Sequence, residues 1–383
     1  MIGILAIAVV LAGFPWQVAT AQRPGEPFTF ALVSDLHYGL TRPRFLGDSA
    51  VPAWRVNAAL AEVLRSLPIR TLPDDGGVQA GAVVGDLAFV AVTGDIANRA
   101  EAGVQPAAVS WREFLTTFVQ PLSRDRRAPL PVFAAAGNHD ASNAIGYVPA
   151  LAPSVDTTAM SGLYRRAERQ DEQALLTAEH DPLRQPFDYA RDRVHYVRWV
   201  GGVAIMVLHI WPDAGEREWM ERELAMIPDT VPVLLFAHDP PLVDPRHFTA
   251  PDGGPPGTGG FQGLLTERWR GEPLPAARLE GSRTLEEFRT LLRRHRNIRA
   301  YFHGHENWTE YHALRDADGT PLLPAFRVDS PLKGRDSAGD DAKLAFLLVS
   351  IDADRRHLTV REYRWALPPD MSPWGAEISI PLR

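Results

Sequence analysis

The stretch "FTFALVSDLH", residues 28–37, decides the fold, because it joins a run of apolar and β-branched residues to a polar end that contains Asp35 and His37. A short continuous apolar run is typical of a strand buried on both faces. In "PAWRVNAALAEVLRSL", residues 52–67, the apolar residues recur at helical spacing, which predicts a helix after this strand. The next apolar run is "AFVAVTGD", residues 88–95, so the first part of the chain reads as a β-α-β unit.

The same pattern recurs further along the chain. A predicted helix in "VSWREFLTTFVQPL" (109–122) precedes the strand "PVFAAAGNHD" (131–140), and the helix "EREWMERELAMI" (216–227) precedes the strand "VPVLLFAHDPP" (231–241). The helix "TLEEFRTLLRRH" (284–295) leads into the strand "IRAYFHGH" (298–305). We expect β-hairpins at 195–211, about a Gly-Gly pair, and in the tail at 344–365. The alternation of strands and helices predicts a layered α/β fold.

The composition excludes several classes of protein. With 383 residues and 45% hydrophobic content, the chain can bury a large core as one α/β domain or two smaller ones. The net charge of -7, without a long basic run, argues against nucleic acid as a partner. The chain has no cysteine, so disulfides, thiolate metal sites and cysteine nucleophiles are excluded. Any metal ligands must therefore be His, Asp, Glu or Asn.

The N-terminal stretch "MIGILAIAVVLAGFPWQVATAQ" contains an apolar run followed by the small-x-small pattern Ala19-Thr20-Ala21. This pattern predicts a signal peptide over 1–21, cleavage before Gln22, and export to the periplasm or the medium. The run is too short to cross a bilayer comfortably, so we expect no permanent membrane span. A buried first strand or an interfacial helix is the alternative.

Two stretches fit no repeat, namely 153–186, which is charged and partly helical, and 244–283, which contains "APDGGPPGTGGFQG". We expect both to be insertions over the functional face, although the second has a composition equally typical of a disordered surface loop. No domain linker separates them from the rest of 22–383.

Oxygen and imidazole groups directly follow the apolar strands. In a doubly wound sheet these groups would converge in the crevice beyond the carboxyl ends of the strands. Carboxylate, amide oxygen and imidazole together suit Mn, Fe or Zn better than Ca or Mg. The residues concerned are Asp35, His37, Asp95, Asn138, His139, His238 and His305.

In this order, the motifs "SDLH", "TGD", "GNHD", "FAHDPP" and "HGHEN" resemble the pattern of the calcineurin-like metallophosphoesterases: D-x-H, G-D, G-N-H-D/E, a separate His, and G-H-x-H. The resemblance covers roughly residues 28 to 310. It implies an α/β sandwich of central mixed β-sheets flanked by helices, with 22–383 as the catalytic domain. It also implies a pair of divalent or trivalent transition-metal ions.

The ligands of both metals follow from the resemblance, residue by residue. Asp35, His37 and Asp95 would hold one metal. Asp95, Asn138, His238 and His305 would hold the other, so that Asp95 bridges a pair of ions about 3.5 to 4 Å apart. The family pattern has a histidine where this chain has Asn307, which we expect to complete the first metal's ligands through its weaker carbonyl oxygen or to turn away.

The implied reaction is hydrolysis of a phosphomonoester or phosphodiester by in-line attack of a metal-bound hydroxide. His139 resembles the family's general acid or phosphate contact, and Asp140 is placed to orient it. The substrate would be a small-molecule or lipid-derived phosphate ester. The sequence leaves the substrate, the metal and the oligomeric state open.

Several alternatives remain at this point. Asp86 also follows a glycine, but it precedes a strand, so Asp95 is the better bridging carboxylate. His209 and His303 could support a ligand or contact substrate, whereas the remaining histidines fit no ligand spacing and are expected to be surface or structural. Because of Asn307, a catalytically weakened periplasmic or cell-surface binding protein is the competing function.

Overall fold

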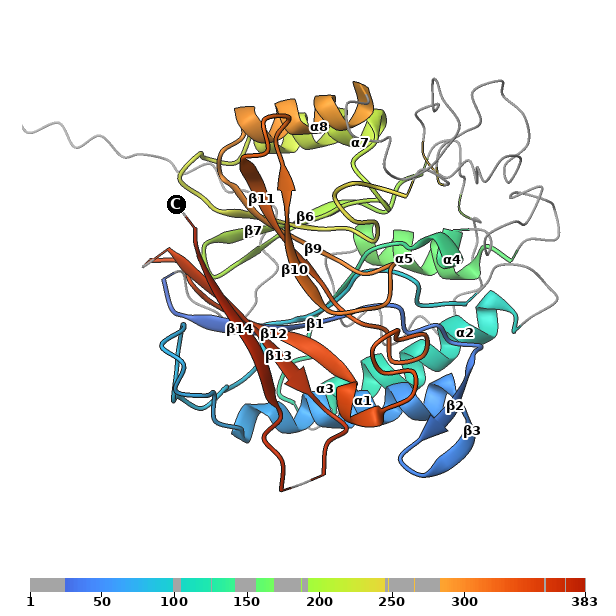
Figure 1. Cartoon of the computed structure of the whole chain (residues 1–383). Helices are drawn as coiled ribbons and strands as arrows, with labels where there is room; N and C mark the ends of the chain where they lie inside the picture. The colour runs from blue at the N-terminus through green and yellow to red at the C-terminus, as the bar shows by residue number, and fades with distance from the viewer. Residues whose placement is uncertain are drawn as a thin grey trace, which may run out of the picture.

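The structure is a computed structural model, shown in Figure 1. It describes residues 25–98, 105–124, 126–141, 156–168, 187, 192–244, 247, 265, 283–354, 356–368 and 370–382. The predicted signal peptide at 1–21 and most of the predicted insertions at 153–186 and 244–283 lie outside these residues. None of the helices within them is long and apolar enough to cross a membrane.

One six-stranded sheet within the described residues has the order β14-β13-β12-β1-β4-β5. The strands β1, β4 and β5 run parallel to one another, and β12, β13 and β14 continue the sheet beyond β1 in antiparallel fashion. The strands are β1 (Phe28–Val33), β4 (Val90–Val92), β5 (Val132–Ala134), β12 (Ala345–Asp352), β13 (His357–Arg364) and β14 (Trp374–Pro381).

The second six-stranded sheet of the described chain has the order β10-β11-β9-β8-β7-β6. Here β7, β8, β9 and β11 are parallel, and β6 and β10 pair antiparallel at the two edges. The strands are β6 (Tyr196–Val200), β7 (Val203–Val207), β8 (Val233–Phe236), β9 (Ile298–His303), β10 (Glu310–Arg315) and β11 (Pro321–Arg327).

The two sheets pack face to face through large apolar side chains. Phe30 of β1 is fully buried, and its ring centroid lies 5.7 Å from that of Phe236 in β8 and 5.8 Å from that of Phe302 in β9. Aromatic rings bury large areas and prefer such edge-to-face contacts. The core between the sheets therefore fixes the ends of β1 and β4 relative to those of β8 and β9.

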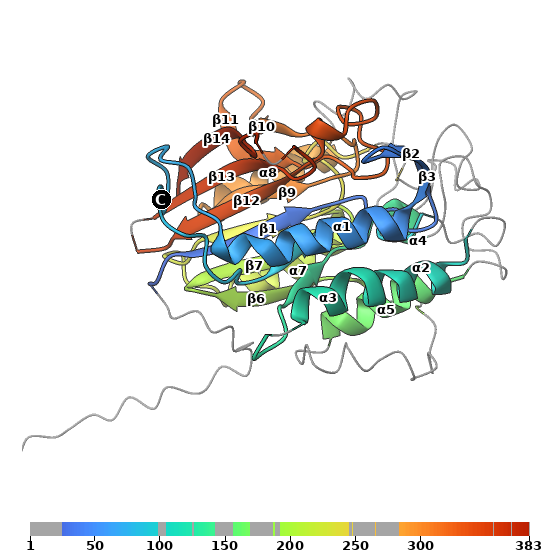
Figure 2. The ribbon, with the colours of Figure 1, turned by 90° about the horizontal axis from the view of Figure 1, so that it is seen from below.

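Helices cover the outer faces of both sheets (Figures 1 and 2). On the side of the first sheet lie α1 (Ala53–Ser66), α2 (Ala107–Phe114), a π-helical turn (Leu115–Val119), α3 (Gln120–Ser123) and α5 (Thr158–Glu168). On the side of the second sheet lie α7 (Ala214–Leu224) and α8 (Arg283–Arg294). The smaller elements are β2 (Thr41–Phe45), β3 (Asp48–Pro52), α4 (Asn138–Ala141) and 3₁₀ turns at Leu67–Ile69 and Asp341–Lys343.

The prediction of an α/β sandwich of mixed sheets flanked by helices is confirmed. The hairpin β6–β7 forms about Gly201 and Gly202, whose φ values of 56° and 86° suit the tight turn between paired strands. The hairpins β2–β3 and β10–β11 and the strand β14 were not predicted. Pro321 and Pro324 lie in β11, and proline inside a strand weakens the strand signal.

Candidate metal centre

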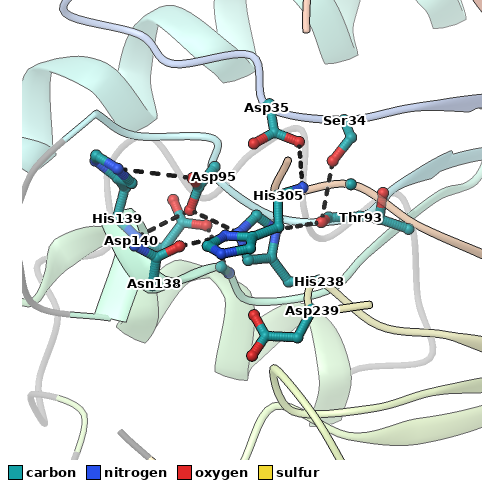
Figure 3. A network of polar contacts seen from close by, with 12 residues as sticks. Ser34, Asp35, Thr93, Asp95, Asn138, His139, Asp140, His238, Asp239 and His305 are labelled. Carbon is teal, nitrogen blue, oxygen red and sulfur yellow. Dashed lines mark hydrogen bonds and ion pairs between the residues drawn. The ribbon is translucent and has the colours of Figure 1, made fainter. Parts of the chain in front are cut away.

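The loops after β1 and β4 run side by side and bring the first two motifs together. The backbone N–H of Asp35 donates to the carbonyl of Gly94 at 3.0 Å, and that of His37 donates to the carbonyl of Asp95 at 2.9 Å. Since β1 and β4 are parallel neighbours, both motifs emerge at the same edge of the sheet. Asn138 follows β5, and His238 and His305 follow β8 and β9, so five strand ends converge on one place (Figure 3).

Three motif glycines allow these loops to approach closely. A Cβ atom on Gly137 would lie 2.3 Å from Oδ1 of Asp95, and one on Gly304 would lie 1.9 Å from Oγ of Ser34. A Cβ on Gly94 would lie 2.6 Å from Nδ1 of His238. Real Cβ atoms do not tolerate such distances, so the glycine of each motif is required by the packing of its polar neighbour.

The backbone is strained at the candidate ligands. Asp35, His37 and Asp95 have φ values of 55°, 41° and 51°, and those of His305 and Asn307 are 71° and 60°. Residues other than glycine rarely adopt a left-handed conformation, and such strain gathers at functional sites. The positive φ values therefore coincide with the positions of the candidate ligands.

One group of polar atoms surrounds His37. Its Nε2 lies 3.6 Å from Oδ1 of Asp35 and 3.6 Å from Oδ2 of Asp95. All three side chains are at most 3% exposed. Asp35 Oδ1 and both ring nitrogens of His37 have no hydrogen-bond partner among the described residues. Buried polar atoms of this kind are costly without a partner, and a bound cation would satisfy them.

A second group surrounds His238. Its Nε2 lies 3.0 Å from Oδ1 of Asn138, 3.3 Å from Oδ1 of Asp95 and 3.2 Å from Nδ1 of His305. Its other nitrogen, Nδ1, lies 2.7 Å from the carbonyl of Thr93, which can only accept, so Nδ1 carries the proton in the neutral ring. The lone pair of Nε2 therefore points into the cluster, as a metal ligand requires.

Asp95 belongs to both groups, because its Oδ2 faces His37 and its Oδ1 faces His238. Figure 3 shows Asp95 and His238. One carboxylate can bind two cations and reduce their mutual repulsion. The oxygen and imidazole donors fit transition metals such as Mn, Fe or Zn. The unpartnered atoms and the donor set together fit a pair of cations.

The pKa values reflect the same concentration of charge. Burial raises the pKa of Asp95, but the nearby His238 and His139 outweigh it and hold that pKa well below its ordinary value. Burial lowers the pKa of His238, but the charge of Asp95 and its hydrogen bond raise it to about 10. The cluster thus binds positive charge strongly, which is the electrostatic condition for holding a metal.

His139 lies beside Asp95 and contacts a residue that sequence reasoning missed. Its Nδ1 makes a short hydrogen bond to the carbonyl of Asn98, and its Nε2 lies 3.2 Å from Nζ of Lys333 and 3.9 Å from Oδ2 of Asp95. Burial lowers the pKa of His139 to about 3, against the attraction of Asp95. Lys333 lies outside every recognised motif, so the sequence carried no signal for it.

Asp140, which we expect to orient His139, makes its hydrogen bonds to the backbone. The carboxylate oxygens of Asp140 accept hydrogen bonds from the backbone N–H groups of Gly137 (3.0 Å), Ile96 (3.2 Å) and Ala97 (2.7 Å). The carbonyl of Asn98 holds the ring instead. Asp140 acts through the backbone, because it fixes the loop that follows Asp95 and carries Asn98.

The side-chain amide of Asn307 directs its nitrogen, Nδ2, to a backbone carbonyl and leaves its oxygen, Oδ1, on the other side. Its Nδ2 donates to the carbonyl of His305 at 2.9 Å, and since that carbonyl can only accept, the amide orientation is determined. Its Oδ1 is buried and has no hydrogen-bond partner among the described residues. The structure therefore leaves the carbonyl oxygen available for coordination.

The other candidates lie outside the cluster. Asp86 is 77% exposed and pairs with Arg126. His209 accepts from the backbone N–H of Val194 at 3.1 Å, and its ring stacks on Phe187. Nε2 of His303 lies 2.8 Å from Nε2 of His312. Neither His209 nor His303 belongs to a group of candidate metal ligands among the described residues.

Asp239, Asp244 and His247 support the second group and were also missed. Oδ2 of Asp244 lies 3.1 Å from Nε2 of His305, and Oδ2 of Asp239 lies 2.6 Å from Nδ1 of the fully buried His247. A carboxylate on the far nitrogen of a ligating histidine fixes its orientation. Asp239 is visible in the "HDPP" motif, whereas Asp244 and His247 lie in a proline-rich stretch without a recognisable pattern.

Comparison with known proteins agrees with this geometry. A family model for the calcineurin-like phosphoesterases matches residues 28–308, well over half of the 383 residues and all of the candidate metal ligands. A search of curated proteins gave no match.

Similar solved structures include a dimetal phosphatase from Danio rerio (12% identity, TM-score 0.48, covering 94% of this chain and 100% of that one). They also include a phosphopantetheinyl hydrolase from Mycobacterium tuberculosis (14% identity, TM-score 0.33, 80% and 91% coverage). A calcineurin-like phosphoesterase from Bacillus subtilis has 12% identity, a TM-score of 0.33, and 94% and 92% coverage. On the evidence of the family model, the chain belongs to the calcineurin-like phosphoesterases and is a metal-dependent phosphoester hydrolase.

Proposed function

We propose that the protein is an exported phosphoesterase that hydrolyses a phosphomonoester or phosphodiester at a pair of transition-metal ions, Mn, Fe or Zn. The position of Asp95 between the His37 group and the His238 group is the observation that carries this proposal. A single buried carboxylate shared by two sets of donors has no evident use in a protein that binds one metal or none.

Two sets of residues would hold the ions. Asp35, His37, Asp95 and Asn307 would hold one, and Asp95, Asn138, His238 and His305 would hold the other. Such a metal pair activates water at neutral pH and neutralises charge on the phosphoryl oxygens.

The protein's own part is to orient these donors. The Thr93 carbonyl holds His238 in the tautomer whose Nε2 faces the cluster. Asp244 contacts the far nitrogen of His305, and Asp140 fixes the loop after Asp95. His139 and Lys333 flank the Asp95 side of the centre, where they can contact the phosphoryl group or the leaving group.

The test is a screen of the purified mature protein with p-nitrophenyl phosphate and bis(p-nitrophenyl) phosphate. We expect hydrolysis that a chelator abolishes and Mn²⁺ restores. Hydrolysis that persists after the metal has been removed, as shown by elemental analysis, would refute the proposal.

The competing function is a catalytically weakened binding protein, which Asn307 favours because the family pattern has a histidine there. The buried carbonyl oxygen of Asn307 and the presence of His139 beside Asp95 support the hydrolase instead. One result distinguishes the two functions. A binding protein loaded with metal would bind phosphate but would hydrolyse neither p-nitrophenyl phosphate nor bis(p-nitrophenyl) phosphate.

Export rests on residues 1–21 alone. An exported enzyme meets small-molecule or lipid-derived phosphate esters outside the cytoplasm. N-terminal sequencing of the protein from periplasm and medium should give a chain that begins at Gln22. An intact Met1 in the cytoplasmic fraction would contradict export without affecting the proposed reaction.

A further inference from the structure

We propose that Lys333 binds the phosphoryl oxygens of the substrate at the metal centre and thereby favours phosphomonoesters over phosphodiesters. The proposal rests on the proposed function. Lys333 lies beyond the residues that the family model matches, 28–308.

The first observation is the position of the Lys333 ammonium group. Its Nζ lies 3.2 Å from Nε2 of His139, whose Nε2 is in turn 3.9 Å from Oδ2 of Asp95. Because Nδ1 of His139 contacts the Asn98 carbonyl, which can only accept, Nε2 of the neutral ring has a lone pair and Lys333 is the donor. The cation thus contacts His139, which itself lies beside the shared carboxylate of Asp95.

The second observation is that the loop around Lys333 is tied to the first metal motif. Oγ of Ser330 donates to the carbonyl of Asp35 at 2.7 Å. The same oxygen accepts from the backbone N–H groups of Leu332 at 3.1 Å and Lys333 at 2.9 Å. The Ser330 hydroxyl therefore links the backbone of Asp35, a candidate ligand, to the backbone of Lys333.

The loop is also held from two other sides. The backbone N–H of Arg335 donates to the carbonyl of Asn307 at 2.6 Å. Arg42, which is 2% exposed, donates to the carbonyls of Pro331 (3.0 Å) and Ser337 (2.6 Å). A Cβ on Gly334 would lie 2.0 Å from Oγ of Ser337, so the turn after Lys333 is tightly packed.

This construction is what a preorganised binding group needs. A lysine on a mobile loop loses conformational entropy when it engages a ligand, whereas a loop fixed to both Asp35 and Asn307 has lost it on folding. Lysine acts as a compact point charge toward phosphate, and its ammonium group is a hydrogen-bond donor.

The preference for monoesters follows from charge. At neutral pH the phosphoryl group of a monoester is largely a dianion, whereas a diester carries one negative charge. The attraction to a nearby cation is proportional to the charge, and it is strengthened where water is partly excluded. Lys333 is half-buried. Its removal should therefore affect the monoester more than the diester.

The experiment compares wild type with Lys333→Gln, Lys333→Arg and the matched control Lys343→Gln. Lys343 is an exposed lysine at the end of the 3₁₀ turn Asp341–Lys343. The control therefore makes the same change of charge at the protein surface. The measurements are metal content, kcat/KM for p-nitrophenyl phosphate and bis(p-nitrophenyl) phosphate, and the affinity of the metal-loaded protein for inorganic phosphate by calorimetry.

We expect Lys333→Gln to keep its metal. Its kcat/KM for the monoester should fall roughly 100-fold, as for the loss of one transition-state donor, and the fall for the diester should be at least five times smaller. Phosphate affinity should fall about tenfold, Lys333→Arg should recover part of each loss, and Lys343→Gln should behave as wild type. Equal losses on both substrates, or no loss, would overturn the inference.

The phosphate measurement separates this inference from the proposed function. If wild type hydrolyses neither substrate, the proposed function fails. Lys333 is then judged by phosphate binding alone, where an affinity unchanged in Lys333→Gln overturns its role as a phosphate contact.

Discussion

Oδ1 of Asp95 lies 3.3 Å from Nε2 of His238, and the two residues come from different sheets. Asp95 follows β4 in the first sheet, and His238 follows β8 in the second. The candidate centre therefore spans the edge where the sheets meet, and the aromatic core behind it sets the distance between its two halves. The predictions below test the individual contributions to this arrangement.

Asp95→Asn should lose most of the bound metal and nearly all hydrolysis. An amide has the shape of the carboxylate but not the negative charge that holds two cations together. Metal content and turnover with p-nitrophenyl phosphate measure both effects. Asp86→Asn is the control, because Asp86 is 77% exposed, pairs only at the surface, and should be replaceable without effect. Full metal content in Asp95→Asn would remove the bridging role.

Asn307→His should lower the Mn²⁺ concentration needed for half-maximal activity, and Asn307→Ala should raise it. Oδ1 of Asn307 is buried without a partner among the described residues, and imidazole is a stronger donor than an amide toward borderline metals. The φ of 60° at this position is one that histidine also adopts more readily than most residues. Activity titrated against free Mn²⁺ is the measurement. Coinciding curves for all three proteins would place Asn307 outside the coordination of either metal.

His139→Ala should bind metal nearly normally and turn over roughly 100- to 10,000-fold more slowly, as is usual when a group that handles protons or contacts the reacting phosphate is lost. The imidazole also holds the ammonium group of Lys333 in place. His357→Ala serves as control, since His357 is exposed at the start of β13. If turnover of His139→Ala matches that of the control, His139 has only a structural part.

Gly304→Ala should destabilise the fold by about 1–3 kcal/mol, as overpacking of a close-packed site does, and should weaken metal binding. The new Cβ would lie 1.9 Å from Oγ of Ser34 and 2.3 Å from Oδ2 of Asp35, so the first motif must move. Gly339→Ala is the matched control, because a Cβ there meets nothing within 4 Å. Denaturant unfolding of both variants gives the comparison, and equal stability would show that the Gly304 contact can relax without cost.

Buried parallel strands were the part of the fold that the sequence revealed best. Strands such as β1, β4 and β8 are covered on both faces, so each reads as an apolar run that ends where its polar groups begin. The strand β14 is mostly half-exposed at the edge of its sheet, and β10 and β11 mix polar residues and prolines with apolar ones. The burial of residues in these three strands depends on partner strands distant in the sequence, so the local pattern of apolar residues does not predict it.

The same limit applies to the candidate site. The motif residues could be named because each follows its own strand, but their supporting contacts come from remote parts of the chain. Lys333 reaches His139 across 194 positions, and Ser330 reaches Asp35 across 295. Asp140 shows the same limit, since its position next to His139 in the sequence did not reveal that its carboxylate binds three backbone amides.

The central claim, that Asp95 is shared by two metal ions, is tested most directly by anomalous diffraction from crystals of the protein grown with Mn²⁺. We predict two anomalous peaks about 3.5 to 4 Å apart on either side of the Asp95 carboxylate. One should be bounded by Asp35, His37 and Asn307, and the other by Asn138, His238 and His305. A single peak, or peaks that Asp95 does not join, would contradict the account.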